Sequence, residues 1–102
     1  MKRKPTSRPM TDDEVDQMAH HFRLLGEPMR LKILEAVCQT PRTVSDIVTA
    51  TASTQANISK HLALLAAAGI LKRARNGQFV YYGVKNQLVV QLCQLVHAQL
   101  VD

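Results

Sequence analysis

The side chains with the clearest capacity for chemistry in this sequence are two cysteines, Cys38 and Cys93, and a histidine, His97. Cys93 and His97 are four residues apart, which would place a thiolate and an imidazole on one helix face, where they can share a metal ion. Such a pair would favour soft metals over hard ones. We favour the competing interpretation that both cysteines fill the core, because free cysteine is among the most buried residue types. Two cysteines cannot form a disulfide framework, so a reducing cytoplasm is the expected location.

The other residues form no pattern that requires catalysis. The sequence has no glycine-rich phosphate loop and no His-Glu-x-x-His pair, and its ionisable residues fall almost wholly on predicted polar faces. At 102 residues the chain is too short for a nucleotide-binding α/β enzyme or a barrel. We therefore expect one domain, which is not an enzyme and has no cofactor.

Positive charge is concentrated in two places. The chain carries 13 lysines and arginines against 8 acids, a net charge of +5. Four of the bases and no acid lie in residues 1–10, which we expect to be a disordered basic tail before a domain over 11–102. A second cluster is formed by Lys72, Arg73 and Arg75. This distribution suits a nucleic-acid surface, although a solubilising tail and a solvated loop would have the same composition.

The elements that would position these residues begin with four helices. The spacing of apolar residues predicts helices over residues 11–25, 28–39 and 43–50 and between Thr54 and Gly69. Each segment is bounded by residue types that start or stop helices. Thr11 with Glu14, and Thr43 with Asp46, have the spacing of a capping box. Thr54 is a further N-cap, Pro28 suits a first helical turn, and Gly26 and Gly69 suit helix ends.

The apolar period then changes to that of strands. Runs at 71–75 and 78–84 flank Asn76-Gly77, a strong signal for a two-residue hairpin loop. Asn86 caps a last helix over about 87–101, which is apolar on more than one side and is expected to pack on a partner subunit. The predicted fold is mainly α with a small β-hairpin: four helices, the hairpin and a final helix, the order of a winged helix-turn-helix. No apolar run reaches a membrane-spanning length, and the N-terminus has no apolar stretch typical of a secretory signal.

Several motifs in this order resemble the ArsR-SmtB family of bacterial transcriptional repressors. The segments are FRLLGEPMRLKIL at 22–34, STQANISKHL at 53–62, Ala68-Gly69-Ile70-Leu71 and the Tyr81-Tyr82 pair. The resemblance spans about residues 15–100. It implies a homodimer formed by the first and last helices, binding to double-stranded operator DNA, commonly upstream of the protein's own operon, and release from DNA by an inducer.

The resemblance also implies which residues contact DNA. Gln and Asn can bind adenine edges in the major groove, while hydroxyls and Lys can hold phosphates. On the predicted recognition helix the expected contacts are Thr54, Gln55, Asn57, Ser59, Lys60 and His61. On the hairpin, near the backbone or the minor groove, they are Arg73, Arg75 and Gln78. An ordinary solvated surface is the alternative for each of these residues.

The inducer is where the sequence departs from the family. Arsenic, cadmium and lead sensors carry a Cys-x-Cys pair where this chain has Thr43 and Ser45. The final-helix zinc and cobalt ligands align with Asn86, Leu88, Gln99 and Asp102, of which only the last could bind metal. A branch that senses persulfides or oxidants has one cysteine in each of the elements that hold Cys38 and Cys93, at different positions along them.

Three alternatives therefore stay open. The protein is a repressor with another inducer or none, a thiol-responsive repressor using Cys38 and Cys93, or a metal-responsive one. In the last case Cys93 and His97 would need further ligands, such as His20 or His21 across the dimer. A rival of a different class is a winged helix that binds protein and no specific DNA.

Overall fold

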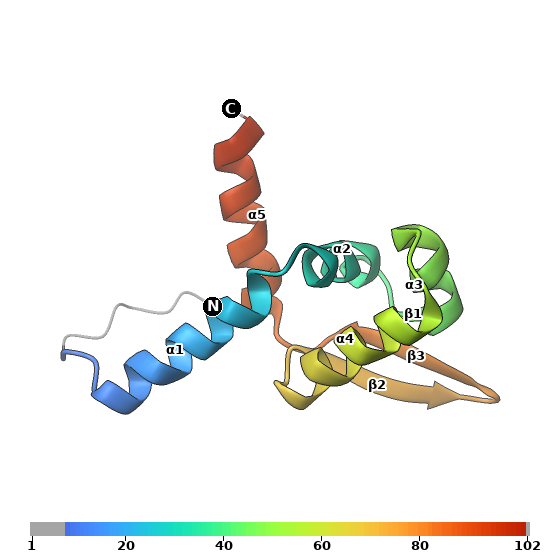
Figure 1. Cartoon of the computed structure of the whole chain (residues 1–102), viewed down its shortest axis with the longest axis horizontal. Coiled ribbons are helices and arrows are strands. Elements are labelled where there is room, and N and C mark those ends of the chain that lie inside the picture. The colour runs from blue at the N-terminus through green and yellow to red at the C-terminus, as the bar shows by residue number, and fades with distance from the viewer. Residues whose placement is uncertain (1–7, 102) are drawn as a thin grey trace.

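The computed structural model describes residues 8–101, which form five helices and three strands. The helices are α1 (Asp12–Leu25), α2 (Pro28–Val37), α3 (Val44–Thr51), α4 (Gln55–Ala67) and α5 (Gln87–Val101). The strands are β1 (Arg42–Thr43), β2 (Leu71–Asn76) and β3 (Phe79–Val84). This order confirms the predicted winged helix-turn-helix (Figure 1). Within the described residues no helix is both long and apolar enough to cross a membrane.

Local capping sets most helix starts, as the sequence predicts. At α1 the Thr11 hydroxyl accepts a hydrogen bond from the Glu14 N–H at 3.2 Å, and the Glu14 carboxylate accepts one from the Thr11 N–H at 2.9 Å. Thr43 and Thr54 cap α3 and α4 by accepting from the N–H groups of Asp46 and Asn57. These bonds satisfy backbone donors that a helix leaves without partners in its first turn.

Two predicted boundaries shift by one or two residues. Helix α2 ends at Val37 rather than near residue 39, so Cys38 is its C-cap. Helix α3 runs over Val44–Thr51 rather than 43–50, because Thr43 is its N-cap and also pairs with Tyr81 in the sheet. Of the predicted tail, residues 1–7 lie outside the described part, and Arg8 forms an ion pair with Glu14 at 2.6 Å.

The core lies between α2, α3, α4 and the base of the hairpin. Its completely buried side chains include Ile33 of α2, Ile47 of α3, and Ile58, Leu62 and Leu65 of α4. The apolar residues of α4 recur at three- and four-residue intervals, so they form one stripe that faces the core. After α4, Gly69 adopts a positive φ of 75°, and the N–H of the buried Ile70 donates to the Leu65 carbonyl. This end of α4 directs the chain into β2.

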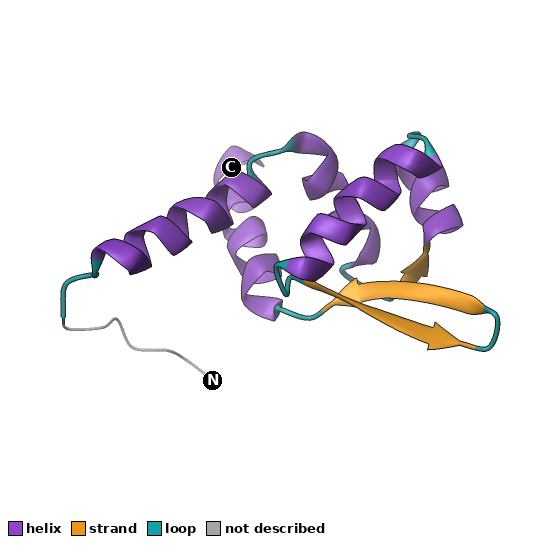
Figure 2. Cartoon of the chain, turned by 60° about the horizontal axis from the view of Figure 1, so that its bottom comes forward, coloured by secondary structure: helices purple, strands orange, loops and turns teal. Residues whose placement is uncertain are grey.

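Strands β2 and β3 form an antiparallel hairpin that projects from the helices as a wing (Figure 2). Asn76 pairs with Phe79, so the two-residue loop is Gly77-Gln78. The prediction of Asn76-Gly77 as the loop is wrong by one residue. Gly77 has φ 65°, and a glycine at the first loop position suits the II′ turn, whose twist matches that of the strands. Gln78 therefore lies in the turn and not in a strand.

A third strand was absent from the predicted order. Strand β1 pairs antiparallel with β3, Arg42 with Tyr82 and Thr43 with Tyr81, which gives a sheet of order β1-β3-β2. Two residues are too few to show the alternating pattern by which strands are recognised in a sequence.

Helices α1 and α5 extend away from this body. In Figure 1, α5 stands at the top of the view and α1 reaches to the lower left, while the hairpin lies at the lower right. Val89, in the first turn, is the one residue of α5 that is fully buried among those described. Leu92 and Cys93 are partly buried against the core, and residues 94–101 of α5 are exposed.

Candidate functional site

The exposed face of α4 carries three polar side chains with no hydrogen bond to another residue in the described part of the chain. They are Gln55, Ser59 and Lys60, all exposed. Gln55 and Ser59 are one helical turn apart and lie on one side of α4, and Lys60 lies next to Ser59, further round the exposed surface of the helix. The buried residues of α4 are Ile58, His61, Leu62 and Leu65, which face the core. Lys60 lies on the other side of the helix from them, and Gln55 is exposed because it lies in the first turn. A face that is free of internal partners can bind an external one with little rearrangement.

Two other predicted contact residues are already used inside the protein. Thr54 is exposed, but its hydroxyl accepts the Asn57 N–H at 3.2 Å as the cap of α4. Asn57 is half-buried, and its side-chain amide donates to the Ser53 hydroxyl at 3.0 Å. These bonds fix the turn between α3 and α4. Thr54 and Asn57 therefore hold the start of α4 in place, whatever else they contact.

The expectation that His61 lies on the exposed face is wrong. Its side chain is buried, with 5% of its surface exposed, and it belongs to the stripe of α4 that faces the core. Arg30 of α2 donates from Nε to His61 Nδ1 at 3.2 Å. Position 61 lies three residues after Ile58 and four before Leu65, so the apolar period already placed it on the inner face. Histidine is a polar residue, and for that reason the prediction assigned it to the exposed face.

The predicted residues of the wing are exposed. Arg73 and Arg75 alternate along β2 and so lie on one face of the hairpin, and Gln78 is in the exposed turn. Lys72, which the predicted contact set omits, is exposed on the same strand and faces the other way. Its place in the basic cluster of the sequence was the signal for it. Figure 1 shows the hairpin on the same side of the molecule as α4, away from α5.

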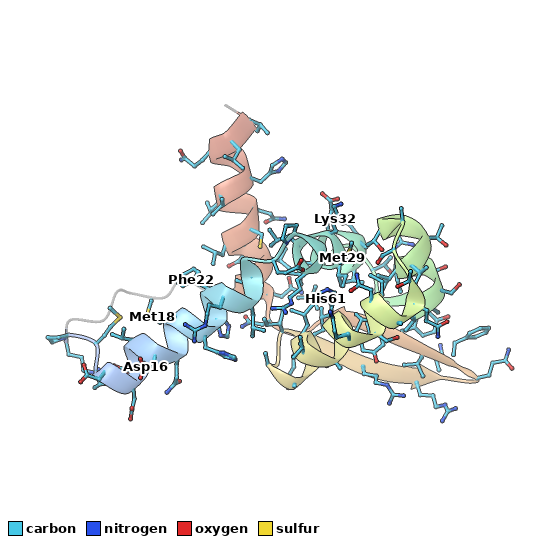
Figure 3. All side chains as sticks on the ribbon, in the orientation of Figure 1. Asp16, Met18, Phe22, Met29, Lys32 and His61 are labelled. Carbon is cyan, nitrogen blue, oxygen red and sulfur yellow. The ribbon has the colours of Figure 1, made fainter. Side chains whose placement is uncertain are left out.

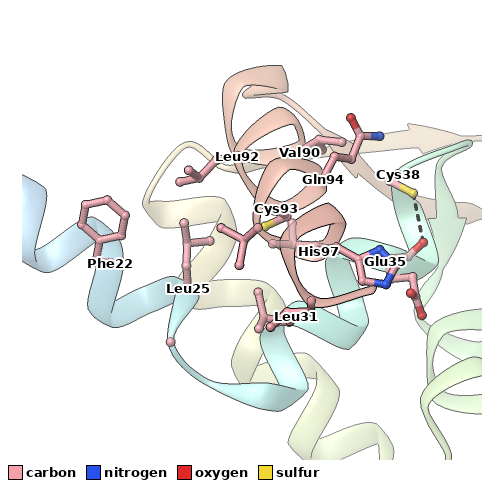
Figure 4. Close-up of a pocket in the computed structure, with 14 residues that line it drawn as sticks. Phe22, Leu25, Leu31, Glu35, Cys38, Val90, Leu92, Cys93, Gln94 and His97 are labelled. Carbon is pink, nitrogen blue, oxygen red and sulfur yellow. Dashed lines mark hydrogen bonds between the residues drawn. The ribbon is translucent and has the colours of Figure 1, made fainter. Parts of the chain in front are cut away.

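A mostly apolar groove with a volume of about 550 Å³ lies between the end of α1, α2 and α5. Cys38, Cys93 and His97 all line it, as do Phe22 and Leu31 (Figure 4). The sequence left open whether the two cysteines meet; the structure places them on one groove, as free thiols. The Cys38 Sγ donates to the Glu35 carbonyl at 3.2 Å.

The groove offers limited support for thiol or metal chemistry. Burial raises the pKa of the Cys93 thiol, so at neutral pH this side chain is the protonated, weakly nucleophilic form. Cys93 and His97 lie on the same groove, but within residues 8–101 no three His, Cys, Asp or Glu side chains come together as metal ligands. Both cysteines are half-buried, so they are less buried than the predicted role as core residues requires.

Large apolar side chains remain exposed on α1 and α5. On α1 they are Val15, Met18 and Phe22, and on α5 they are Leu88, Leu95, Val96, Leu100 and Val101. Leu95 and Leu100 are 69% and 78% exposed. We call these eight residues the apolar face. So many exposed large apolar side chains on two helices are typical of a protein–protein interface.

Comparison with known proteins connects this architecture to one group. Residues 27–73 match the family described as bacterial regulatory protein, arsR family. The chain is 30% identical to the transcriptional repressor SmtB homolog of Synechocystis sp., over 81% of this chain and 63% of that protein. It is 31% identical to the probable mercury resistance operon repressor of Streptomyces lividans, over 85% of this chain and 70% of that one. The chain thus spans about two thirds of the length of these relatives.

A solved structure agrees in fold. The solution structure of the homodimeric winged helix-turn-helix DNA-binding domain Mb0332 from Mycobacterium bovis superimposes with a TM-score of 0.76 at 30% identity. The match covers 89% of this chain and 87% of that domain. The similarity therefore includes the extended α1 and α5 as well as the helix-turn-helix and the wing.

Proposed function

Because this chain belongs to the ArsR family of bacterial transcriptional regulators, which are not enzymes, we propose that it is a homodimeric repressor that binds double-stranded operator DNA. The observation that carries the proposal is the exposed polar face of α4, with Gln55, Ser59 and Lys60 free of internal partners, on the same side of the molecule as the basic hairpin. The two surfaces together present hydrogen-bonding groups for bases and positive charge for phosphates.

In this proposal α4 enters the major groove. Gln55, in its first turn, can form two hydrogen bonds with the N6 and N7 atoms of an adenine. Ser59 and Lys60 reach bases or phosphates beside it. Thr54 and Asn57 lie at the same end of α4 and contribute through the geometry of the turn. His61 leaves the predicted contact set because it is buried.

The wing supplies contacts to the DNA backbone. Arg73 and Arg75 share one face of the hairpin, and Gln78 lies at its tip. Arginine binds phosphate oxygens and enters narrow minor grooves, so these residues add affinity and fix the orientation of α4. Lys72, on the other face of β2, is a further candidate.

We propose that the apolar face closes a homodimer. Its eight residues on α1 and α5 are exposed in the described chain, and the similar Mb0332 domain is a homodimer. A second copy would cover both helices at once and place two α4 helices on one face of the DNA. A two-fold dimer of this kind binds half-sites about one DNA turn apart. A reducing cytoplasm, where the DNA is, would be its location.

We further propose that the repressor regulates its own operon and is released from DNA by an inducer. The cysteine pair gives a second candidate, a thiol-responsive repressor, because Cys38 and Cys93 line one groove between α2 and α5. A sulfur modification of Cys38 would then change how α5 packs on α2. A metal-responsive repressor has less support, since Cys93 and His97 gain no third ligand within residues 8–101.

The test is a titration of the protein onto labelled DNA from upstream of its own gene, at fixed salt and with excess random competitor. Specific binding is expected, and Gln55→Ala should weaken it by about 1–3 kcal/mol and relax the preference at one base pair. Gln39→Ala is the matched control, because Gln39 is also exposed but lies in the loop after α2. Specific affinity and sequence preference that are unchanged by Gln55→Ala would contradict the assignment of α4. Flat, non-specific binding would favour the protein-interaction module.

The same titration distinguishes the inducers. A thiol switch would be assigned if mild oxidation or persulfide treatment abolishes DNA binding by the wild type while Cys38→Ser still binds DNA after the same treatment. A metal inducer would be assigned if zinc or cadmium abolishes DNA binding by the wild type while His97→Asn still binds DNA in the presence of the metal. Binding unchanged under all conditions would leave both cysteines as structural residues and point to a different inducer.

A further inference from the structure

Arg30 joins three helices through one guanidinium group. Its Nε donates to His61 Nδ1 of α4 at 3.2 Å, and its Nη1 donates to the Leu24 carbonyl near the end of α1 at 3.3 Å. Its own backbone N–H donates to the Glu27 carboxylate at 3.0 Å, which caps α2. Figure 3 shows His61 on the α4 side of α2, with Lys32 on the opposite side. Arg30 thus lies where the α1–α2 turn meets the proposed recognition helix.

The bond between Arg30 and His61 requires one protonation state of the histidine. Because Nδ1 accepts from Arg30, it carries no proton, so the neutral ring has its proton on Nε2. The Nε2 atom faces the Glu27 carboxylate at 3.8 Å. A protonated ring would lose the acceptor at Nδ1 and would place a second cation against Arg30.

Charged groups from three parts of the chain face His61. The α1–α2 turn contributes the Glu27 carboxylate, α2 contributes the Arg30 guanidinium, and α4 itself contributes Lys60. Burial is the largest cause of a lowered pKa of His61; the Glu27 carboxylate opposes it, and the Arg30 and Lys60 charges add to it. The neutral ring is therefore the form that the folded protein favours at neutral pH.

Resting on the proposed DNA binding by α4, we infer that Arg30 and His61 are positioning residues: the bond between them fixes the rotation of α4 about its axis and so orients the polar face toward DNA. His61 follows Lys60 directly and lies one turn after Asn57. A movement of the ring out of its buried site would turn Ser59 and Lys60 with it. Because Arg30 also donates to the end of α1, the same side chain connects α4 to the helix that carries part of the apolar face.

Three variants separate this role from simple stabilisation. His61→Asn keeps an acceptor oxygen near the place of Nδ1 and does not titrate. His61→Phe keeps an aromatic ring of similar size and removes the acceptor. Arg30→Met keeps the length of the side chain and removes the donor. We expect His61→Phe and Arg30→Met to lose about tenfold in affinity for the upstream DNA at pH 7.5, and His61→Asn to stay close to wild type.

The pH profile gives the readout that a merely structural role would not change. The affinity for the upstream DNA is measured between pH 7.5 and 5.5 for wild type and for His61→Asn. Both wild type and His61→Asn contain His20, His21 and His97, so their difference reports His61. Wild type should lose affinity relative to His61→Asn as the pH falls, by less than about tenfold at pH 5.5, because the lowered pKa of His61 keeps part of the protein in the neutral form. Identical profiles for the two proteins, or wild-type affinity of His61→Phe at pH 7.5, would overturn the inference.

A measurement without DNA keeps this inference separate from the proposed function. Nitrogen NMR of the free wild-type protein at pH 7.5 should show His61 as the neutral ring with its proton on Nε2 and a hydrogen-bonded Nδ1. A proton on Nδ1 would overturn the inference even if DNA binds. If His61→Asn does not fold, Arg30→Met decides: wild-type affinity would refute the positioning role. Absence of specific DNA binding with the expected tautomer would refute the proposed function instead.

Discussion

Removal of the two wing arginines should change the salt dependence of DNA binding by an amount that follows from the number of positive charges removed in the proposed dimer. Arg73 and Arg75 are exposed, and they lie on the same face of β2 because they alternate along it. Within residues 8–101, Arg8 forms an ion pair with Glu14 and the Glu27 carboxylate faces the neutral His61 ring, so neither wing arginine is neutralised there. Arg73→Ala with Arg75→Ala should therefore leave the free energy of unfolding within about 0.5–1 kcal/mol of wild type.

The magnitude follows from the number of phosphates that the wings neutralise. For duplex DNA, the slope of log K against log salt concentration is about −0.9 for each phosphate contact. A homodimer carries two wings, so the double variant removes four cations from each complex. The slope should become less negative by about 3.6. On doubling the salt concentration, the wild type should then lose roughly 12-fold more affinity than the double variant.

The assay is fluorescence anisotropy of a labelled duplex from upstream of the gene, at a series of NaCl concentrations and constant pH. Lys32→Ala is the matched control, because Lys32 is exposed on the side of α2 away from α4 (Figure 3). Its slope should equal that of wild type. A double variant with the wild-type slope would refute the assignment of the wing to DNA, while a change of about 1.8 would mean that only one wing of the dimer, or one arginine of each wing, contacts phosphate.

Three further predictions concern the dimer, a helix end and the buried histidine. Leu95→Asp places a charge on the apolar face, so sedimentation velocity should show that it converts the proposed dimer to monomers. The control Gln94→Asp changes an exposed polar position one residue earlier and should stay dimeric. A dimeric Leu95→Asp would contradict the proposed interface. Gly69→Ala should lower the free energy of unfolding by about 1–2 kcal/mol in urea titrations, because φ is +75° while the added Cβ meets no atom within 4 Å; an unchanged midpoint would show that the backbone relaxes there. Because folding lowers the pKa of His61, the unfolded chain takes up the proton first as the pH falls. The contribution of His61 to stability is therefore complete above about pH 6.5 and is lost as the pH falls through that value toward the folded pKa. The free energy of unfolding should fall more steeply with falling pH for wild type than for His61→Asn, and parallel curves would count against a lowered pKa.

What the sequence determined by itself was the set of local features. The N-caps Thr11, Thr43 and Thr54 and the stop at Gly69 act through bonds to residues a few positions away, so residue types and spacing were enough to find them. The apolar period separated the helices from the hairpin. The ordered motifs then indicated the family and, with it, the general role of α4 and the wing.

Only the tertiary structure decided which distant residues meet and how inward-facing polar residues are satisfied. The apolar period of α4 places His61 on the buried side, but the donor that its imidazole needs comes from Arg30, 31 residues earlier. Strand β1 exists because β3 pairs with two residues that lack a strand pattern of their own. Cys38 and Cys93 line one groove because the fold places α5 across it from α2. Each of these depends on packing between segments far apart in the chain, whose free energy is not encoded in any local window of residues.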